Sequence, residues 1–326
     1  MKPTKGIAIC FLALLLLQCN GKQKPTIIDI TAPTGVQIFR QPRAGLKPPF
    51  LFSADIFETK YAYTKSDIKP AQAGTQFTGQ VMEAMSRQYK GDLEAAVKDA
   101  ALSVNIAEEL AKQVNFTIDA RGLKVYMVSP SDVEFKGGTD CVSYMTSFKD
   151  NNSKLVLETF SADSLIITAS NTHSEEFKAA LKAKLGEQFK ANFEMVEKGE
   201  GKTAYTITGQ NLVYGYTAAS LLIELYSADK PLSLDAPIDK EVDIASTFGV
   251  EWIRAIRVEQ TGDGQSYLIR IYPKFGESAF LRLSRGEQKD LAVGKRLVLT
   301  IALKDTAGSK VKLSLTGFNL TFKGAS

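Results

Sequence analysis

Histidine, cysteine and tryptophan are scarce in this chain: its 326 residues include one histidine, three cysteines and one tryptophan. Because His173 is the single imidazole, zinc sites built from three histidines, from HExxH or from two cysteines and two histidines are excluded. The sequence also lacks the GxxxxGK[ST] loop that cradles phosphates and the GxSxG turn that carries a nucleophilic serine. These absences favour a protein that is not an enzyme, and we expect no metal and no cofactor.

Long hydrophobic runs are also missing, apart from one at the N-terminus. Ile7–Leu17 is an unbroken apolar run of eleven residues, preceded by Lys2 and Lys5 and followed by polar residues from Gln18 onward. Eleven residues fall short of the roughly 20 that a membrane-spanning helix needs. A positive start, a short apolar core and a processing site are typical of a secretory signal peptide, here residues 1–18.

Cys19 follows this run directly, in the sequence Leu-Leu-Gln-Cys. The arrangement resembles the lipobox of bacterial lipoproteins, and Gln18 before the cysteine is similar to the relaxed lipobox of spirochaetes. The resemblance implies that Cys19 carries acyl chains such as palmitate and becomes the N-terminus of the mature chain. Two acyl chains anchor a protein stably to a membrane where one does not. An ordinary secretory signal or a signal anchor is the alternative.

The mature chain has almost balanced charge. Removing residues 1–18 takes away two of the 40 basic residues, so 38 basic and 36 acidic side chains remain in 308 residues. A net charge near +2 argues against nucleic acid as a partner. Cys10 leaves with the signal peptide and Cys19 is acylated, so Cys141 has no cysteine left with which to form an intramolecular disulfide. A hydrophobic content of 44% is that of a globular protein, and the length suffices for two domains.

Changes in composition divide the mature chain into three parts. Prolines and glycines interrupt every apolar run up to residue 49, which predicts a flexible tether over residues 19–49, with an edge strand over 27–38 as an option. Residues 50–227 mix helical and strand patterns and predict an α+β domain with an antiparallel sheet and amphipathic helices. Residues 228–326 consist almost entirely of strand patterns and predict an antiparallel β-sandwich.

Two helical segments are expected in the α+β domain. Residues 78–114 place apolar side chains at spacings of three and four, with a break at Gly91-Asp92. Ser174 is expected to cap a helix over Glu175–Leu185 that ends at Gly186. The turn signal at 150–153 predicts a hairpin between the strands on either side of it. Strands are expected at 50–64, 115–118, 123–128, 141–148, 154–160, 165–169, 189–195 and 203–207.

Few polar clusters could carry chemistry. Cys141 and His173 could form a nucleophile–base dyad, although a buried thiol and a solvated histidine explain both residues as well. Asp263 with Glu259 could bind calcium, and a hairpin turn at 262–264 is the alternative. Arginines alternate with aromatic residues, as they do in platforms that stack sugars or bases and on ordinary sandwich surfaces. The residues concerned are Arg257, Arg270, Arg282, Arg285, Tyr267, Tyr272 and Phe280.

Residues 115–210 resemble a family of pore-forming proteins. The segment Gly138–Ser147 is similar to the Gly-Thr-His-Tyr-Val motif of the membrane attack complex/perforin family and to a strand of the cholesterol-dependent cytolysins. The strands and the helix that follow come in the order found in that family. The resemblance implies that helical clusters at 78–114 and 174–208 unfold into membrane-crossing hairpins.

The sequence therefore predicts an α+β protein that acyl chains on Cys19 hold in the bacterial cell envelope, at the outer membrane or cell surface. The leading expectation is a non-catalytic module that binds a protein or glycan partner. One alternative is a pore-forming or membrane-perturbing protein of perforin/cytolysin-like fold. Another is a hydrolase that uses Cys141 and His173.

Overall fold

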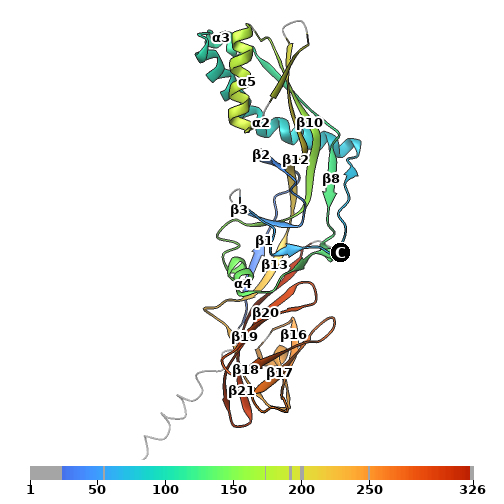
Figure 1. The fold of residues 1–326 in the computed structure, drawn as a ribbon, viewed down its shortest axis with the longest axis vertical. Helices are drawn as coiled ribbons and strands as arrows, with labels where there is room; N and C mark the ends of the chain where they lie inside the picture. Colours follow the sequence, from blue (N-terminus) through green and yellow to red (C-terminus); the bar gives the residue numbers. More distant parts are fainter. Residues whose placement is uncertain are drawn as a thin grey trace, which may run out of the picture. The chain divides into compact units, whose positions relative to one another are not determined.

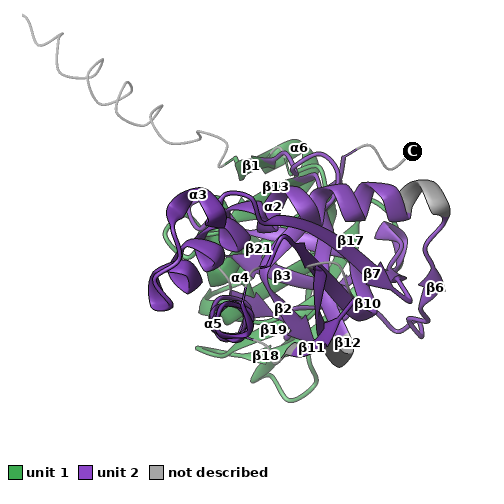
Figure 2. Ribbon diagram, turned by 90° about the horizontal axis from the view of Figure 1, so that it is seen from above, with its two compact units in different colours: residues 1–29, 135–149, 222–321 green, residues 30–134, 150–221, 322–326 purple. Residues whose placement is uncertain are grey.

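The computed structural model describes residues 24–53, 56–172, 174–190, 193–198, 202–248 and 250–323. The chain divides into two units (Figure 2). Unit 1 contains the described parts of residues 1–29, 135–149 and 222–321, and unit 2 contains those of residues 30–134, 150–221 and 322–326. Helices coexist with extensive antiparallel sheets, and the C-terminal part is all sheet apart from one short helix, so the predicted α+β class is confirmed.

Two long antiparallel strands form the centre of unit 2 and run side by side in Figure 1. β10 (Lys154–Ser170) and β12 (Lys202–Ala219) pair from Leu155 opposite Ala219 to Ser170 opposite Lys202. The strands predicted at 154–160 and 165–169 are therefore one strand. The other strands of this sheet are β2 (Gln37–Ala44), β3 (Phe50–Ser53), β4 (Ile56–Glu58), β6 (Ala71–Gln72), β7 (Asn115–Arg121), β8 (Lys124–Met127) and β11 (Phe193–Glu197).

The central pair bends where its pairing is irregular. Three register shifts fall between residues 156 and 164 of β10, and bulges of this kind bend a strand and increase its twist. Gly215 lies in the same part of β12, opposite Phe160. A Cβ atom at this position would lie 2.6 Å from the carbonyl oxygen of Gln37, so β2 reaches its pairing distance only because the residue is glycine.

α2 (Thr75–Ser103) is one helix that continues through the break predicted at Gly91-Asp92. Gly91 is exposed, and its cost in a helix, about 1 kcal/mol, is outweighed by a buried stripe that keeps its phase on both sides of it. The helix ends at Ser103, and the one-turn helix α3 (Glu108–Ala111) follows. The stripe consists of Val81, Met85, Tyr89, Leu93, Ala96, Val97, Ala100 and Ala101.

α5 (Glu175–Phe189) begins where the sequence predicts. The Ser174 hydroxyl accepts a hydrogen bond from the backbone N–H of Phe177 at 3.1 Å. The helix does not end at Gly186. It continues to Phe189, which is buried, and Lys190 then takes a left-handed conformation with φ of 50°. The strand predicted at 189–195 is thus the last turn of α5 and, after it, β11.

The strand predicted at 141–148 is wrong, because these residues form helix α4 (Thr139–Thr146) of unit 1. Cys141, Val142, Met145 and Phe148 are buried, at the spacings of one helix face. The predicted hairpin with residues 154–160 is therefore wrong as well. That part of β10 pairs with β3, β8 and β12.

Residues 26–44 include two strands where a flexible tether is predicted. β1 (Thr26–Ile30) is the edge strand of a sheet, in agreement with the edge strand expected as an option over residues 27–38. β2 pairs with β12 and buries Phe39, whose ring stacks on Tyr216 with centroids 4.9 Å apart. Pro42 is compatible with β2 because proline is tolerated in a strand whose N–H groups are not all needed by neighbours.

The C-terminal strands of unit 1 form two antiparallel sheets that share one hydrophobic core, which confirms the predicted sandwich. One sheet has the order β1-β13-β21-β20-β19, with β14 beside β21, and the other has the order β15-β16-β17-β18. α6 (Ile244–Phe248) adds one turn. The strands are β13 (Leu221–Tyr226), β14 (Leu232–Pro237), β15 (Glu241–Asp243), β16 (Ile253–Gln260), β17 (Ser266–Pro273), β18 (Ala279–Ser284), β19 (Gln288–Val293), β20 (Leu297–Ala307) and β21 (Lys310–Phe322).

Candidate membrane-active site

Four neighbouring strands of unit 2, in the order β7-β10-β12-β11, form one end of its sheet. Their side chains alternate between an apolar and a more polar face. One cross-strand row consists of Ile118, Ile167, Tyr205 and Met195, which are directly opposite one another. The next row on the other face contains Thr117, Thr168 and Ala204. These strands are thus amphipathic, and the apolar face needs a cover.

Helices α2 and α5 provide this cover. Their buried side chains belong to the same hydrophobic core as Ile167 and Tyr205. Tyr89 of α2 meets Phe189 of α5 edge to face, with ring centroids 4.9 Å apart. The Tyr89 hydroxyl also donates a hydrogen bond to the carbonyl oxygen of Phe39 at 3.2 Å. The two helices are therefore fixed to each other as well as to the sheet.

Each helical segment is inserted between strands that already lie in one sheet. α5 and β11 connect β10 to β12, which are directly paired up to Ser170 and Lys202. α2 and α3 connect β6 to β7, and β6 pairs with β8, which continues the line of β7 along β10. A segment in such a position can become a β-hairpin while its two flanking strands stay paired with each other. For α5–β11, the pairing of β11 with β12, from Phe193 opposite Ile207 to Glu197 opposite Thr203, is given up in exchange.

The α5–β11 segment carries a pattern that fits a strand as well as a helix. From Phe177 to Met195 the odd-numbered positions are apolar, with the exception of Glu187. The even-numbered positions are polar, with the exceptions of Ala180 and Gly186. The strand predicted at 189–195 covers only the last part of this alternation. It extends further back because the core residues of α5 are four apart, and a spacing of four keeps to one face in a helix and in a strand alike.

Polar contacts hold the start of α5 against β11. The Lys178 ammonium donates to Glu175 at 2.6 Å and to Glu197 of β11, and the lysine side chain is only 13% exposed. The hydroxyl of Tyr205 donates to the Lys178 carbonyl oxygen at 3.3 Å. The hydrogen bond and the charge of Lys178 hold the pKa of Glu197 below its ordinary value.

The candidate residues of the sequence analysis do not come together in one site. Cys19 and His173 lie outside the described residues. Cys141 is on α4 of unit 1 with 1% of its surface exposed, so its sulfur is screened from any substrate in solution. Within the described ranges, no group of three or more His, Cys, Asp or Glu side chains is arranged to hold a metal ion.

Asp263 and Glu259 have separate partners. Asp263 accepts hydrogen bonds from the Thr261 hydroxyl at 2.6 Å and from the backbone N–H groups of Gln265 and Ser266, and these bonds lower the pKa of its carboxyl group. Glu259 pairs with Arg257 at 2.8 Å. Asp263 thus stabilises the turn between β16 and β17, in agreement with the hairpin alternative.

Only some of the predicted arginine and aromatic residues share a surface of the β15–β18 sheet: Tyr267 is buried in the sandwich core, and Arg285 follows β18 and pairs with Asp305. Arg257, Arg270 and Phe280 are opposite one another on three adjacent strands, and the Arg270 guanidinium lies 5.8 Å from the centroid of the Phe280 ring. Glu259 lies within ion-pair distance of both arginines. The arrangement balances the charges of the facing arginines locally.

No protein-family model matches the chain, and no curated protein matches it. Among solved structures, it is similar to the structure of a bacterial gasdermin from Bradyrhizobium tropiciagri. The sequences are 16% identical, the TM-score is 0.29, and the match covers 60% of this chain and 84% of that chain. At this TM-score the two folds superpose only in part. In the described part of the chain, no helix has both the length and the apolar character to cross a bilayer.

Proposed function

We propose that this protein perturbs membranes by pore formation and that the α5–β11 segment is the part that enters the bilayer. The supporting observation is the position of this segment between two directly paired strands, together with its alternating pattern. β10 and β12 are in unbroken register from Ser164 opposite Thr208 to Ser170 opposite Lys202. Moving one residue toward the C-terminus along β10 therefore corresponds to moving one residue toward the N-terminus along β12.

Continuing this register outward places Phe177 opposite Met195, Ala179 opposite Phe193 and Leu181 opposite Ala191. All of these positions are odd-numbered, so they fall on one face. It is the same face that Leu165, Ile167 and Ala169 of β10 present to the helices. The apolar face of the present sheet would thus extend directly into an apolar face of the new hairpin.

The lengths agree with this reading. Residues 177–185 and 187–195 give two strands of nine residues on either side of Gly186, and a tilted strand needs about 9–11 residues to cross a bilayer. Glu187, the exception among the odd-numbered positions, falls beside the turn at Gly186. The polar residues at 171–176 and the segment 196–201, which is polar or glycine apart from Val196, would connect the crossing part to the existing sheet.

α2 lacks this alternation. Its sequence from Val81 to Leu102 follows the spacing of a helix, and charged residues occur at odd and even positions, for example Glu83 and Glu94. Each chain therefore supplies one crossing hairpin. A single hairpin has unpaired edges, which are costly in lipid, so several copies must pair edge to edge in the membrane.

Dye leakage from liposomes tests this function. Ala179 and Ala183 are exposed on α5, so Ala183→Arg leaves the folded protein intact, yet it places a charge on the lipid-facing side of the hairpin. Such a charge costs about 2–4 kcal/mol near the bilayer centre, so we expect leakage to fall at least tenfold. Ala95→Arg, at an exposed position of α2, is the matched control and should leak like the wild type. Equal leakage by both variants, or none by the wild type, would contradict the proposal.

The N-terminal sequence favours a second candidate, a lipid-anchored envelope protein that binds a protein or glycan partner. It rests on the run Ile7–Leu17 followed by Cys19. Metabolic labelling with palmitate should mark the wild type, and Cys19→Ser should abolish both labelling and partition into the detergent phase. If the Cys19→Ser variant is processed and partitions like the wild type, acylation of Cys19 as the membrane anchor would be contradicted. Anchoring and pore formation are compatible, because the anchor determines location and the hairpin determines activity.

A further inference from the structure

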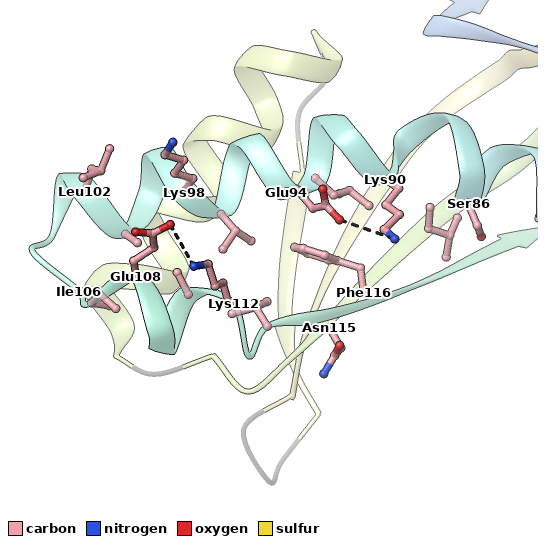
Figure 3. Close-up of a pocket in the computed structure, with 16 residues that line it drawn as sticks. Ser86, Lys90, Glu94, Lys98, Leu102, Ile106, Glu108, Lys112, Asn115 and Phe116 are labelled. Carbon is pink, nitrogen blue, oxygen red and sulfur yellow. Dashed lines mark ion pairs between the residues drawn. The ribbon is translucent and has the colours of Figure 1, made fainter.

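A cavity of about 710 Å³ lies between α2, α3 and β7 in unit 2 (Figure 3). This volume falls in the range of pockets that hold small molecules, roughly 300–1,000 Å³. Its interior is apolar: α2 contributes Leu93, Val97 and Ala101, and β7 contributes Phe116 and Ile118. The cavity is a feature separate from the α5–β11 segment, and it is not used by the proposed pore.

The cavity exists because the cover of the sheet is incomplete here. α2 ends at Ser103, and the chain turns back at once, with the Ile106 N–H bonded to the Ala101 carbonyl oxygen at 2.9 Å. α3 has only one turn, and its buried residue is the small Ala111. Phe116 and Ile118, which belong to the apolar face of the sheet, are therefore only half-buried.

The shape of the cavity suits a chain-like ligand. Its lining follows α2 from Ser86 to Leu102, sixteen residue steps or about 24 Å along the helix axis. One acyl chain extends about 15 Å, half the thickness of the hydrocarbon core of a bilayer. An alkyl chain would therefore fit lengthwise between α2 and β7, in contact with the apolar interior.

Charged side chains surround the mouth. Lys90 pairs with Glu94 at 3.9 Å, and Lys112 pairs with Glu108 at 3.2 Å, both drawn as dashed lines in Figure 3. Lys98 stands at the edge of the rim, directed away from these pairs, and no carboxylate of the described residues lies within ion-pair distance of it. The residues that line the cavity thus carry one uncompensated positive charge, on an exposed and flexible side chain whose ammonium is directed outward in Figure 3.

We propose that this cavity binds a single-chain amphiphile with an anionic head group, such as a long-chain fatty acid. The alkyl chain lies between α2 and β7, and the head group lies at the rim within reach of the flexible Lys98 side chain. The ligand chemistry follows from the length of the groove, its apolar lining and the sign of the uncompensated charge.

Displacement of a fluorescent fatty acid from the mature chain carrying Cys19→Ser tests this site, with all ligands kept below their micelle concentrations. Affinity should rise about fourfold for each methylene added from octanoate to palmitate. This factor is the free energy of burying one methylene group, converted to a ratio of dissociation constants. Palmitate should bind more tightly than hexadecanol and hexadecyltrimethylammonium. Lys98→Glu should weaken palmitate about fivefold, whereas Lys304→Glu, an exposed lysine of unit 1, should not.

Ala101→Phe fills the cavity and should abolish displacement, provided that circular dichroism shows the helices intact. If the Ala101→Phe variant does not fold, the Lys98→Glu variant decides the question, because Lys98 is exposed and its replacement does not disturb the core. Equal affinity for all three head groups would overturn the role of Lys98. Absence of palmitate binding would overturn the site. Self-association that buries Phe116 in place of ligand would identify a second copy of the chain as the occupant, and it would also overturn the proposal. None of these outcomes depends on whether the protein forms pores.

Discussion

Tyr89 and Phe189 meet edge to face at 4.9 Å, and this contact joins α2, which follows β6 of the sheet, to α5, which is inserted between the central strands β10 and β12. Both side chains are almost completely buried. The contact stabilises the arrangement in which α5 covers the apolar face of β10 and β12. Under the proposed function, it opposes conversion of α5 into a hairpin.

Phe189→Ala should therefore weaken the covered state. A buried phenylalanine replaced by alanine costs about 3–5 kcal/mol, and aromatic pairs add about 1 kcal/mol to simple burial. We expect a corresponding loss in the free energy of unfolding, measured by urea denaturation, and leakage at lower protein concentration. Phe280→Ala, a 63% exposed phenylalanine of unit 1, should change stability by less than about 0.5 kcal/mol. Similar losses for both variants would contradict this account of the contact.

Ser174 caps α5, and its removal should have a smaller effect. Ser174→Ala leaves the Phe177 N–H without its acceptor, which costs about 1 kcal/mol. Ser174→Asn should retain most of the stability, because asparagine caps equally well. Hydrogen exchange of the first turn of α5 reports the effect locally. Faster exchange in the asparagine variant than in the alanine variant would show that the cap is not the cause.

The ion pair of Lys178 and Glu197 gives the α5–β11 contact a pH dependence. The pKa of Glu197 is lowered in the folded protein, so its contribution is complete above the ordinary glutamate value of about 4.3 and is lost as the pH falls through the lower folded value. We expect the urea midpoint of the wild type to fall more steeply below about pH 4 than that of Glu197→Gln. Glu194→Gln, at an exposed position of the same strand, should retain the wild-type profile. Parallel profiles for the wild type and Glu197→Gln would contradict the assignment.

The cavity proposal adds a prediction that links ligand and pore. A ligand that binds the folded state at a hundred times its dissociation constant stabilises that state by about 2.7 kcal/mol. If α2 must move when α5 leaves it, saturating palmitate should raise the melting temperature and reduce leakage together. A rise in melting temperature without any change in leakage would show that α2 stays in place during conversion.

The sequence predicts which helices and strands are amphipathic better than it predicts whether a segment is a helix or a strand. The Ser174 cap, the α5 helix and the strands of the sandwich are visible in it, because capping and alternation are local signals. Residues 141–148 mislead because β-branched and aromatic residues suggest a strand, while the burial of Cys141, Met145 and Phe148 follows a helix. Only packing against the rest of unit 1 selects between the two.

Other features depend on contacts that are distant in the sequence. The prolines and glycines of residues 26–44 indicate a tether, yet β2 is held by its pairing with β12, more than 160 residues away. The register of β10 with β12, which carries the proposed function, also cannot be read from either strand alone. The cavity at β7 likewise arises from where α2 ends, and the sequence places a break near Gly91 instead.

Disulfide crosslinking tests the central claim most directly. Lys182 of α5 and Lys190, which directly follows the helix, are eight residues apart, about 12 Å along the helix axis, and this exceeds the 7 Å limit on the Cα–Cα distance of a disulfide. In the proposed hairpin, continued from Ser170 opposite Lys202, they are directly opposite each other. The double variant Lys182→Cys/Lys190→Cys, in a Cys141→Ala and Cys19→Ser background, should crosslink only after exposure to liposomes.

Ala183→Cys/Lys190→Cys is the control, because these positions fall on opposite faces of the hairpin. The account predicts a membrane-dependent disulfide in the first pair and none in the second. No disulfide in the first pair while the liposomes leak, or equal crosslinking of both pairs, would contradict it.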